Sequence, residues 1–369
     1  MTTPVSPVGH NANWGPAPVR PIPDPGVKKY LDFLHYAGAM HFDWSDLLLQ
    51  PLYVLNAFLF SGQARFFWLY TLCGILLGYT AHRLSGDRTP FHRVLFARNA
   101  WLSRSAINDY GIVIINPFVK FLLLTWIITD FKTLIGAGFA LIEAAGVTGR
   151  VTGADTVFIS ACLTLALFLV DDFLRWALHY IEHEVPVLWE FHKVHHSAEV
   201  LNFVTAERFH PVEMLFLGTF FALGATLVNG TFILFFGDTL TVVSVAGANI
   251  LFVAFNLIGG VLRHSPVWLS FGPGLERWLI SPAMHQIHHS DDPRHFNRNL
   301  GGALAVWDRM FGTLHIPQGR ETVTYGIGEE NGEYRSLSAL YLLPFAKAWK
   351  RLAGRETAQD ASTTRDIAS

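Results

Sequence analysis

The chain has 369 residues, of which only 15% are charged and 51% are hydrophobic, and its mean hydropathy is +0.32. Soluble proteins carry about 25% charged residues, so the composition excludes disorder for most of the chain and indicates a membrane protein. A net charge of −2 excludes a nucleic-acid binder that works through basic charge. The two cysteines, Cys73 and Cys162, lie in apolar runs, which excludes a disulfide scaffold and a cysteine-ligated iron–sulfur cluster.

The two ends of the chain differ in composition from its middle. Seven prolines and no apolar run lie within residues 1–25, so residues 1–26 are predicted to be a disordered tail rather than a signal peptide. Residues 351–369 are predicted to be a second disordered, polar tail. Between them we expect an N-terminal transmembrane region, 27–150, and a histidine-rich domain, 151–350.

Six long uncharged runs are candidate membrane spans. In chain order they are Leu47–Ala64, Phe66–Ala81, Tyr110–Val119 with Phe121–Thr129, Thr156–Val170, Met214–Gly237 and Thr239–Leu262. A bilayer core takes about 20 helical residues, and the last two runs are long enough without flanking residues. Asp238 between them predicts the turn of a helical hairpin. The glycine-rich run 133–148 predicts a short re-entrant or interfacial segment.

Positive charge predicts the sidedness of these spans. Arginines gather at 83–104 and again from Arg263 onward, whereas the opposite loops hold only Arg65, Lys132 and Arg150. Because cytoplasmic loops carry an excess of Lys and Arg, we expect about six spans with both termini, residues 171–211 and everything after 262 in the cytoplasm.

A membrane protein is not expected to be rich in histidine, because histidine is costly in lipid. This chain has 17 histidines. Ten of them lie between 179 and 289, and all follow predicted spans on the same predicted face. They are His179 and His183; His192, His195 and His196; His210; His264; and His285, His288 and His289. Helical residues four apart share a face, so each group directs imidazoles to one side.

The spacing of these histidines predicts a metal site. The two H-x-x-H-H groups, the H-x-x-x-H group and His264 supply nine imidazoles, which is a set suited to two ions. Imidazole favours iron, zinc, copper or nickel over magnesium or calcium. Asp172, Glu182 and Glu199 lie near the groups and are candidate acceptors for the second ring nitrogen of a ligand. The predicted fold is therefore an all-α, polytopic integral membrane bundle with a cytoplasmic helical cap that holds a dimetal site.

These motifs resemble the fatty acid hydroxylase/sterol desaturase superfamily of membrane histidine-box di-iron oxygenases. The stretch 172–183 resembles the first box and HKVHH at 192–196 the second, whereas residues 202–213 resemble the Asn/Thr/Arg/His-Pro/Glu signature of the sterol-desaturase branch. His264 resembles the isolated histidine, and HQIHH at 285–289 with the following Asn-Leu-Gly resembles the closing box.

The resemblance implies a ligand set and its surroundings. The implied metal ligands are His179, His183, His192, His195, His196, His264, His285, His288 and His289, with no catalytic residue beyond the dimetal site. The implied supporting residues are Asp172, Asn202, His210, Glu213 and Asn299; for His210 we favour a structural role over a tenth ligand. Trp268 stands where the 2-hydroxylase branch has a further histidine, which favours nine ligands. Iron is the implied metal, with zinc an alternative in purified protein, and O2 is the co-substrate.

The expected activity is hydroxylation, or the related desaturation, of a C–H bond in a sterol-like or fatty-acyl membrane lipid. A carotenoid or ether-lipid hydroxylase on the same scaffold is the alternative. The chain has no dinucleotide or flavin glycine motif and no cluster cysteines, so we expect an external ferredoxin- or cytochrome-type donor with its reductase. Aromatic residues near the boxes are candidates to line a substrate slot: Trp176, Trp189, Phe191, Phe203, Phe209, Trp268 and Trp278.

Two rivals from other classes make different demands on the histidines. A histidine-rich metal transporter would place them inside the spans, along a translocation path, whereas here they flank the spans. A membrane zinc hydrolase would keep an open site with three protein ligands, and nine histidines exceed that number.

Overall fold

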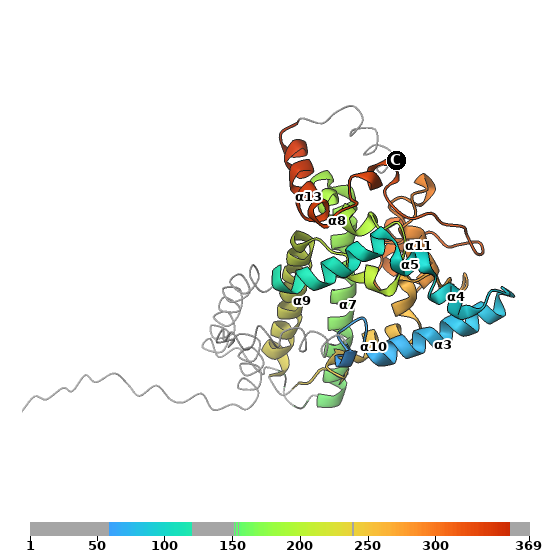
Figure 1. Ribbon diagram of the computed structural model, residues 1–369. Helices are drawn as coiled ribbons and strands as arrows, with labels where there is room; N and C mark the ends of the chain where they lie inside the picture. The colour runs from blue at the N-terminus through green and yellow to red at the C-terminus, as the bar shows by residue number, and fades with distance from the viewer. Residues whose placement is uncertain (1–58, 120–150, 152, 154, 238–239, 355–369) are drawn as a thin grey trace, which may run out of the picture. The chain divides into compact units, whose positions relative to one another are not determined.

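The computed structural model describes residues 59–119, 151, 153, 155–237 and 240–354, and helices dominate this part of the chain (Figure 1). The longer helices are α3 (Trp68–Leu84), an unlabelled helix at 104–119, α7 (Thr156–Glu184), α8 (Pro186–His196), α9 (Pro211–Phe236) and α13 (Leu337–Leu352). The short helices are α4 (Phe91–Leu95), α5 (Arg98–Leu102), α10 (Ile250–Leu257), α11 (Pro282–His288) and α12 (Val306–Phe311). Four 3₁₀ helices are η1 (Phe203–Glu207), η2 (Gly260–His264), η3 (Pro293–His295) and η4 (Gly328–Gly332), and one hairpin pairs β1 (Ser244–Val245) with β2 (Ala248–Asn249).

The long helices α7 and α9 pack against each other. Asp155 begins α7 by accepting hydrogen bonds from the backbone N–H groups of Val157 and Phe158, and α9 begins at Pro211 and ends at Gly237, where φ is 82°. The close approach of the pair requires a residue without a side chain at position 224. A Cβ at Gly224 would lie 2.4 Å from Leu174 Cδ1, and small residues at such points let helix backbones approach.

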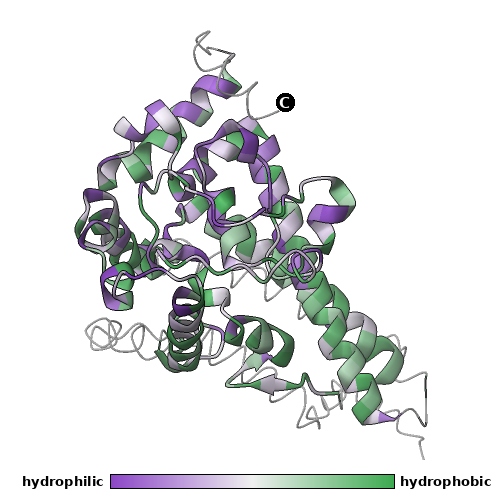
Figure 2. Ribbon diagram, turned by 90° about the vertical axis from the view of Figure 1, so that its right-hand side faces the viewer, coloured by the Kyte–Doolittle hydropathy of each residue, from purple (hydrophilic) through white to green (hydrophobic). Residues whose placement is uncertain are grey.

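Two helices in the described part, α7 and α9, are long and apolar enough to cross a membrane. Large apolar side chains on both are exposed, for example Val157 at 79% and Leu227 at 70%. Both helices are largely hydrophobic in Figure 2, whereas the segments around α8 and α13 carry much of the polar colouring. Apolar surface of this extent is unfavourable in water and is typical of contact with lipid or with another apolar partner.

The predicted span over Thr239–Leu262 is wrong, and so is the helical hairpin that it implied. The β-branched run 241–245 favours extended backbone, and Ala246 (φ 49°) and Gly247 (φ 79°) turn the chain into the β1–β2 hairpin. The Asn249 side chain then caps α10, which has only eight residues. This apolar run therefore folds back on itself instead of crossing.

The remaining span predictions have mixed outcomes. Phe66–Ala81 corresponds to α3, whose 17 residues fall short of the roughly 20 that a span takes. The helix at 104–119 begins before the predicted run at Tyr110, and residues 121–129 lie outside the described residues. Most of Leu47–Ala64, the run 133–148, the tail 1–26 and most of the tail 351–369 also lie outside them. The count of six spans and the domain boundaries stay predictions.

Helix α13 packs against α8 at the end of α7 that is distant from Thr156 (Figure 1). Ile112, Val194, Tyr334 and Leu340 form the apolar core of this region. On the outer side, Lys193 of α8 lies 2.9 Å from Glu330, which also binds Lys347 of α13. Helix α8 is therefore covered on one face while its histidines point to the other.

Candidate metal centre

All nine histidines of the predicted ligand set come together, and we call them the cage. They are brought by α7 (His179, His183), α8 (His192, His195, His196), η2 (His264) and α11 with its C-cap (His285, His288, His289). Eight are buried, and His179 is partly exposed. Local sequence sets these elements: Pro186 and Pro282 occupy first turns, and the Ser281 side chain caps α11.

The cage consists of two groups of facing ring nitrogens. His179, His183, His192, His196 and His288 form one group, and His195, His264, His285 and His289 form the other. Within each group the candidate ligand atoms lie within 4.8 Å of one another.

The cage nitrogens have the spacing that a shared ion requires. The Nε2 atoms of His179 and His192 are 3.0 Å apart, and His264 Nε2 lies 3.0 Å from His289 Nε2 and 3.1 Å from His285 Nε2. Two nitrogens that each lie about 2.1 Å from one ion are about 3.0–3.4 Å apart at right or tetrahedral angles.

Three further Nε2 atoms, those of His183, His196 and His288, are buried without a hydrogen-bond partner. Buried polar atoms in native proteins are normally satisfied. The donor set therefore fits an ion in each group.

Backbone carbonyls accept from the second ring nitrogen of three cage histidines. His179 Nδ1 lies 2.8 Å from Leu300 O, His288 Nδ1 lies 2.9 Å from Arg298 O, and His195 Nδ1 lies 3.3 Å from Arg208 O. An acceptor at Nδ1 places the proton there and leaves Nε2 free to bind a metal. Backbone carbonyls, which sequence motifs do not reveal, thus fix three ligand tautomers.

Side-chain acceptors orient two more histidines. Glu213 Oε1 lies 2.9 Å and Glu182 Oε2 3.5 Å from Nδ1 of His192, and Asn297 Oδ1 lies 3.1 Å from Nδ1 of His183. Sequence reasoning missed Asn297; its positive φ of 55° is tolerated by asparagine but gives no signal in the sequence.

Burial keeps the cage imidazoles neutral. For His264 and His285, which lie outside the two long helices, burial and then neighbouring histidines hold the pKa well below the usual range. Metals bind the neutral form of imidazole. The site is therefore in the correct protonation state for metal binding at neutral pH.

Asp172 touches no cage histidine but positions a loop that does. Its carboxylate accepts hydrogen bonds from the backbone N–H of Ala303 at 2.6 Å and Leu304 at 3.0 Å. Asp308 likewise accepts from the N–H of Leu300 at 2.9 Å. These two buried carboxylates hold the segment whose Leu300 carbonyl binds His179.

The other three predicted supporting residues also act away from the cage. Asn202 caps η1 and donates to Ala100 O. His210 caps α9, and its Nε2 lies 3.1 Å from Tyr341 O, so the structure places it outside both nitrogen groups. Asn299 donates to Met284 O and accepts from the N–H of His315. Glu199 pairs instead with Arg335 at 3.8 Å, and among the described residues no hydrogen bond or ion pair joins its side chain to the cage.

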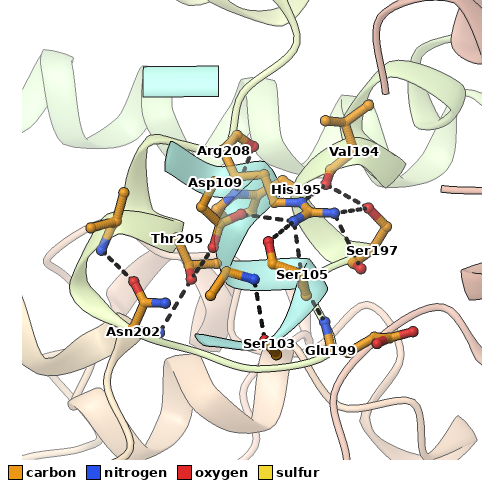
Figure 3. Close-up of polar contacts among 12 residues, drawn as sticks. Ser103, Ser105, Asp109, Val194, His195, Ser197, Glu199, Asn202, Thr205 and Arg208 are labelled. Carbon is orange, nitrogen blue, oxygen red and sulfur yellow. Dashed lines mark hydrogen bonds and ion pairs between the residues drawn. The ribbon is translucent and has the colours of Figure 1, made fainter. Parts of the chain in front are cut away.

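A buried arginine supports the α8 end of the cage (Figure 3). Arg208, 1% exposed, donates through Nη1 to Asp109 Oδ1 at 2.7 Å, through Nε to Val194 O at 2.7 Å and through Nη2 to Ser197 Oγ at 2.9 Å. Its own carbonyl is the acceptor for His195. Sequence reasoning missed Asp109, which lies in the helix at 104–119, 99 residues before Arg208 in the sequence.

A third cluster of potential ligands differs from the cage. His295 Nε2 lies 3.3 Å and His315 Nε2 3.6 Å from the carboxylate of Glu321. Here a carboxylate faces the two histidine nitrogens, whereas the cage contains nitrogens facing nitrogens.

A cavity of about 600 Å³ opens beside the cage. It is lined by cage histidines of both groups and by apolar residues of the two long helices, including Leu167, Val170, Leu217 and Phe221. Of the seven aromatic residues proposed for a substrate slot, Phe209 lines this cavity, and it stacks on His195 with ring centroids 5.0 Å apart.

Arg65 also lines the cavity, which corrects its predicted placement. The charge pattern assigned it to the membrane face opposite the histidines. Its Nη1 donates to Ala206 O at 2.8 Å, and it shares the cavity wall with His195 and His264. That assignment assumed that Phe66–Ala81 crosses the membrane, whereas the loop before α3 docks on the β1–β2 hairpin through Gly62 N–H and Ala246 O.

Residues 164–313 match the family model described as fatty acid hydroxylase. Alkylglycerol monooxygenase of Danio rerio is 32% identical over 187 residues, which cover 51% of this chain and 37% of that protein. The Homo sapiens enzyme of the same name is 30% identical over 43% of this chain and 32% of its own length. Ornithine lipid hydroxylase OlsE of Rhizobium tropici is 31% identical over 43% of this chain and 44% of that protein.

The chain thus aligns with about a third to less than half of the length of these relatives. No solved structure matches it. The matches confirm the resemblance that the histidine motifs indicated.

Proposed function

Because residues 164–313 belong to the fatty acid hydroxylase superfamily, we propose that this chain is a membrane-bound di-iron enzyme that hydroxylates a C–H bond of a lipid with O2. The observation that carries the proposal is the pair of histidine groups, with Nε2 atoms 3.0–3.3 Å apart and five Nδ1 atoms held by acceptors.

In this proposal, different residues bind the metal, orient its ligands and hold the lipid. Bound irons would supply the redox chemistry that activates O2, and the nine cage histidines would hold them. Glu213, Asn297 and the carbonyl of Leu300 keep the ligand protons on Nδ1. The apolar wall from α7 and α9 would hold the lipid chain and exclude water from the reacting carbon.

Hydroxylation with O2 requires electrons that must come from a separate donor. One oxygen atom enters the C–H bond and the other leaves as water, which consumes two electrons and two protons from outside. We propose a ferredoxin- or cytochrome-type donor with its reductase, docking on the cytoplasmic face. We also propose that residues 184–211 and 265–350 lie on that face, so cysteines introduced there should react with a membrane-impermeant label only after the cytoplasmic side is opened.

Two substrate classes have specific support. The family match favours a fatty-acyl or sterol-like lipid, and the named relatives favour an ether lipid equally, because four of those that match are alkylglycerol monooxygenases. The relatives are named as monooxygenases and hydroxylases, which favours hydroxylation over desaturation.

The test is O2 uptake by the iron-loaded full chain with a chemical or protein reductant and separate pools of acyl, sterol and ether lipids, followed by mass spectrometry under labelled O2. We expect a product heavier by one labelled oxygen atom in one pool, absent from His195→Ala and present in His92→Ala, whose histidine is exposed. No oxidised lipid from any pool, together with metal movement across vesicles, would instead support the transporter.

A further inference from the structure

Three arginines line the cavity beside the cage. They come from three segments that are distant in sequence: Arg65 from the loop before α3, Arg175 from α7 and Arg263 from η2. Each is half-buried. Half-buried guanidinium groups at a cavity wall are costly unless they meet a partner.

Each arginine lies close to a cage histidine, either in sequence or through an intervening aromatic ring. Arg175 precedes His179 by four residues on α7, so the two share a helix face. Arg263 directly precedes His264. The Arg65 guanidinium lies 5.2 Å from the centre of the Phe209 ring, which stacks on His195. The three cations therefore lie at the metal end of the cavity.

The protein uses only part of the donor capacity of these guanidinium groups. Arg65 donates through Nη1 to Ala206 O, and Arg175 donates through Nε to Asp171 at 3.1 Å. Arg263 donates through Nε to Gly260 O and through Nη1 to Gly302 O. Among the described residues, no acceptor is hydrogen-bonded to any of the three Nη2 atoms or to Nη1 of Arg175.

The carboxylates of the cavity are already engaged. Asp171 accepts from Arg175, and Glu213 and Glu182 face His192. Glu207, which is not part of the cavity lining, lies 3.9 Å from Arg65. The arginines also repel each other. Their three like charges share one cavity wall. An anion in the cavity would relieve this repulsion.

We propose that Arg65, Arg175 and Arg263 bind the anionic headgroup of the lipid substrate, a carboxylate or a phosphate, inside the cavity. Guanidinium groups recognise both anions through paired N–H donors. This inference rests on the proposed lipid hydroxylase function and names the substrate class. Because the arginines adjoin the cage, the C–H bond that reacts lies near the headgroup end of the lipid.

The rest of the cavity suits the chain of such a lipid. Phe221 lies under the Arg175 guanidinium at 4.2 Å, and Phe252 lies at 5.5 Å. Beyond them, Leu167, Val170 and Leu217 continue the apolar wall along α7 and α9. A polar end at the arginines and a tail along these helices match an amphipathic lipid entering from the bilayer.

The experiment measures lipid binding to the purified, metal-loaded full chain without reductant. The probes are palmitic acid against hexadecanol, for a carboxylate, and dipalmitoyl phosphatidic acid against dipalmitoylglycerol, for a phosphate. We expect at least one anionic probe to bind about tenfold more tightly than its neutral match. Arg175→Gln and Arg263→Gln should each remove most of that preference, and Arg175→Lys should keep part of it. Arg294→Gln, an exposed control whose arginine pairs with Asp292, should leave it unchanged.

The outcomes separate the two proposals. Metal content equal to that of the unmodified chain shows that a variant is folded, and Arg65→Gln on its loop provides a third independent variant. Equal affinity for anionic and neutral probes, or a preference that survives all three glutamine variants, overturns the headgroup site. Anion-selective binding supports the site even if no lipid is oxidised, a result that would remove the hydroxylase function alone.

Discussion

Each cage histidine has two nitrogens with separate roles, and both roles depend on neighbours. Nε2 faces the other histidines, and in five of the nine Nδ1 meets a carbonyl or carboxylate. The sequence predicted the nine residues because box spacing is local. It did not predict the acceptors Leu300, Arg298 and Asn297. Every residue carries a backbone carbonyl, so residue type does not mark the two carbonyl acceptors, and a single asparagine in a loop belongs to no repeating pattern.

His285 tests the division into two groups. His285→Ala removes one of four nitrogens from its group and none from the group of five. We expect metal content to fall from about two ions per chain to about one or fewer, measured by elemental analysis of purified protein. His92→Ala, at an exposed histidine, is the control. Two ions retained in His285→Ala would contradict the ligand assignment.

Asp109 tests the support behind His195. Asp109→Ala leaves the guanidinium of Arg208 buried and unpaired, and breaking a buried pair costs about 3–5 kcal/mol. We expect a lower unfolding free energy and loss of metal, measured by denaturant unfolding in detergent and elemental analysis. Arg294→Ala, which breaks an exposed pair, should leave both unchanged; an equal loss in the two variants would show that Asp109 has no special role.

At the scale of elements, apolar runs that were all predicted to be membrane spans had different outcomes. Helices α7 and α9 follow from long apolar runs with caps at Asp155 and Gly237. The equally apolar Thr239–Leu262 does not form one helix, because its β-branched residues, Ala246–Gly247 turn and Asn249 cap outweigh hydropathy. Hydropathy measures the preference for lipid, whereas turn chemistry decides whether the run is continuous.

Gly224 tests the packing of α7 on α9. Gly224→Val adds a branched side chain where a Cβ already approaches Leu174 Cδ1 to 2.4 Å, and overpacking costs about 1–3 kcal/mol. We expect a lower melting temperature in detergent. Gly218→Val is the matched control on the same helix, because no atom lies within 4 Å of a Cβ there. Equal melting temperatures for the two variants would rule out close packing at Gly224.

Glu330 tests the ionic contact between α8 and α13. Burial raises the pKa of Glu330, but Lys193 and Lys347 outweigh burial and hold it below its usual value. Because the folded pKa is lower than the unfolded one, ionised Glu330 stabilises the fold above about pH 4.3, and this contribution is lost as pH falls through the folded pKa. Glu330→Gln should therefore reduce stability at pH 7 and differ less from the unmodified chain in acid.

The measurement is denaturant unfolding of metal-free protein at several pH values, so that loss of metal does not enter. Glu329→Gln, at an exposed neighbour in η4, is the control. A stability difference for Glu330→Gln that stays constant with pH would contradict the assignment.

On the scale of the whole molecule, the cage connects the consecutive helices α7 and α8 with η2 and α11, which follow more than sixty residues later. Without ions, nitrogens 3.0–3.3 Å apart face each other in a buried site. Bound ions would therefore contribute folding free energy to α7, α8, η2 and α11 together.

Metal removal tests this connection. A chelator should lower the melting temperature by about 5 °C or more and speed hydrogen exchange in α8 and α11, with recovery on adding Fe²⁺. The part of α9 beyond Gly224 is the internal control, because it touches no cage histidine. Uniform exchange before and after chelation would show that the cage does not hold these elements together.

The sequence by itself determined the residues of the cage, the resemblance to fatty acid hydroxylases and the apolar helices α7 and α9, because spacing of three or four residues and long apolar runs are local properties of the chain. Tertiary structure decided what those residues meet. It divided nine histidines into two groups, gave Arg208 its partner Asp109 and brought Arg65 to the cavity shared with Arg175 and Arg263. These arrangements join segments up to about two hundred residues apart in the sequence. They form only in the folded chain, because folding buries polar groups, and buried polar groups need partners.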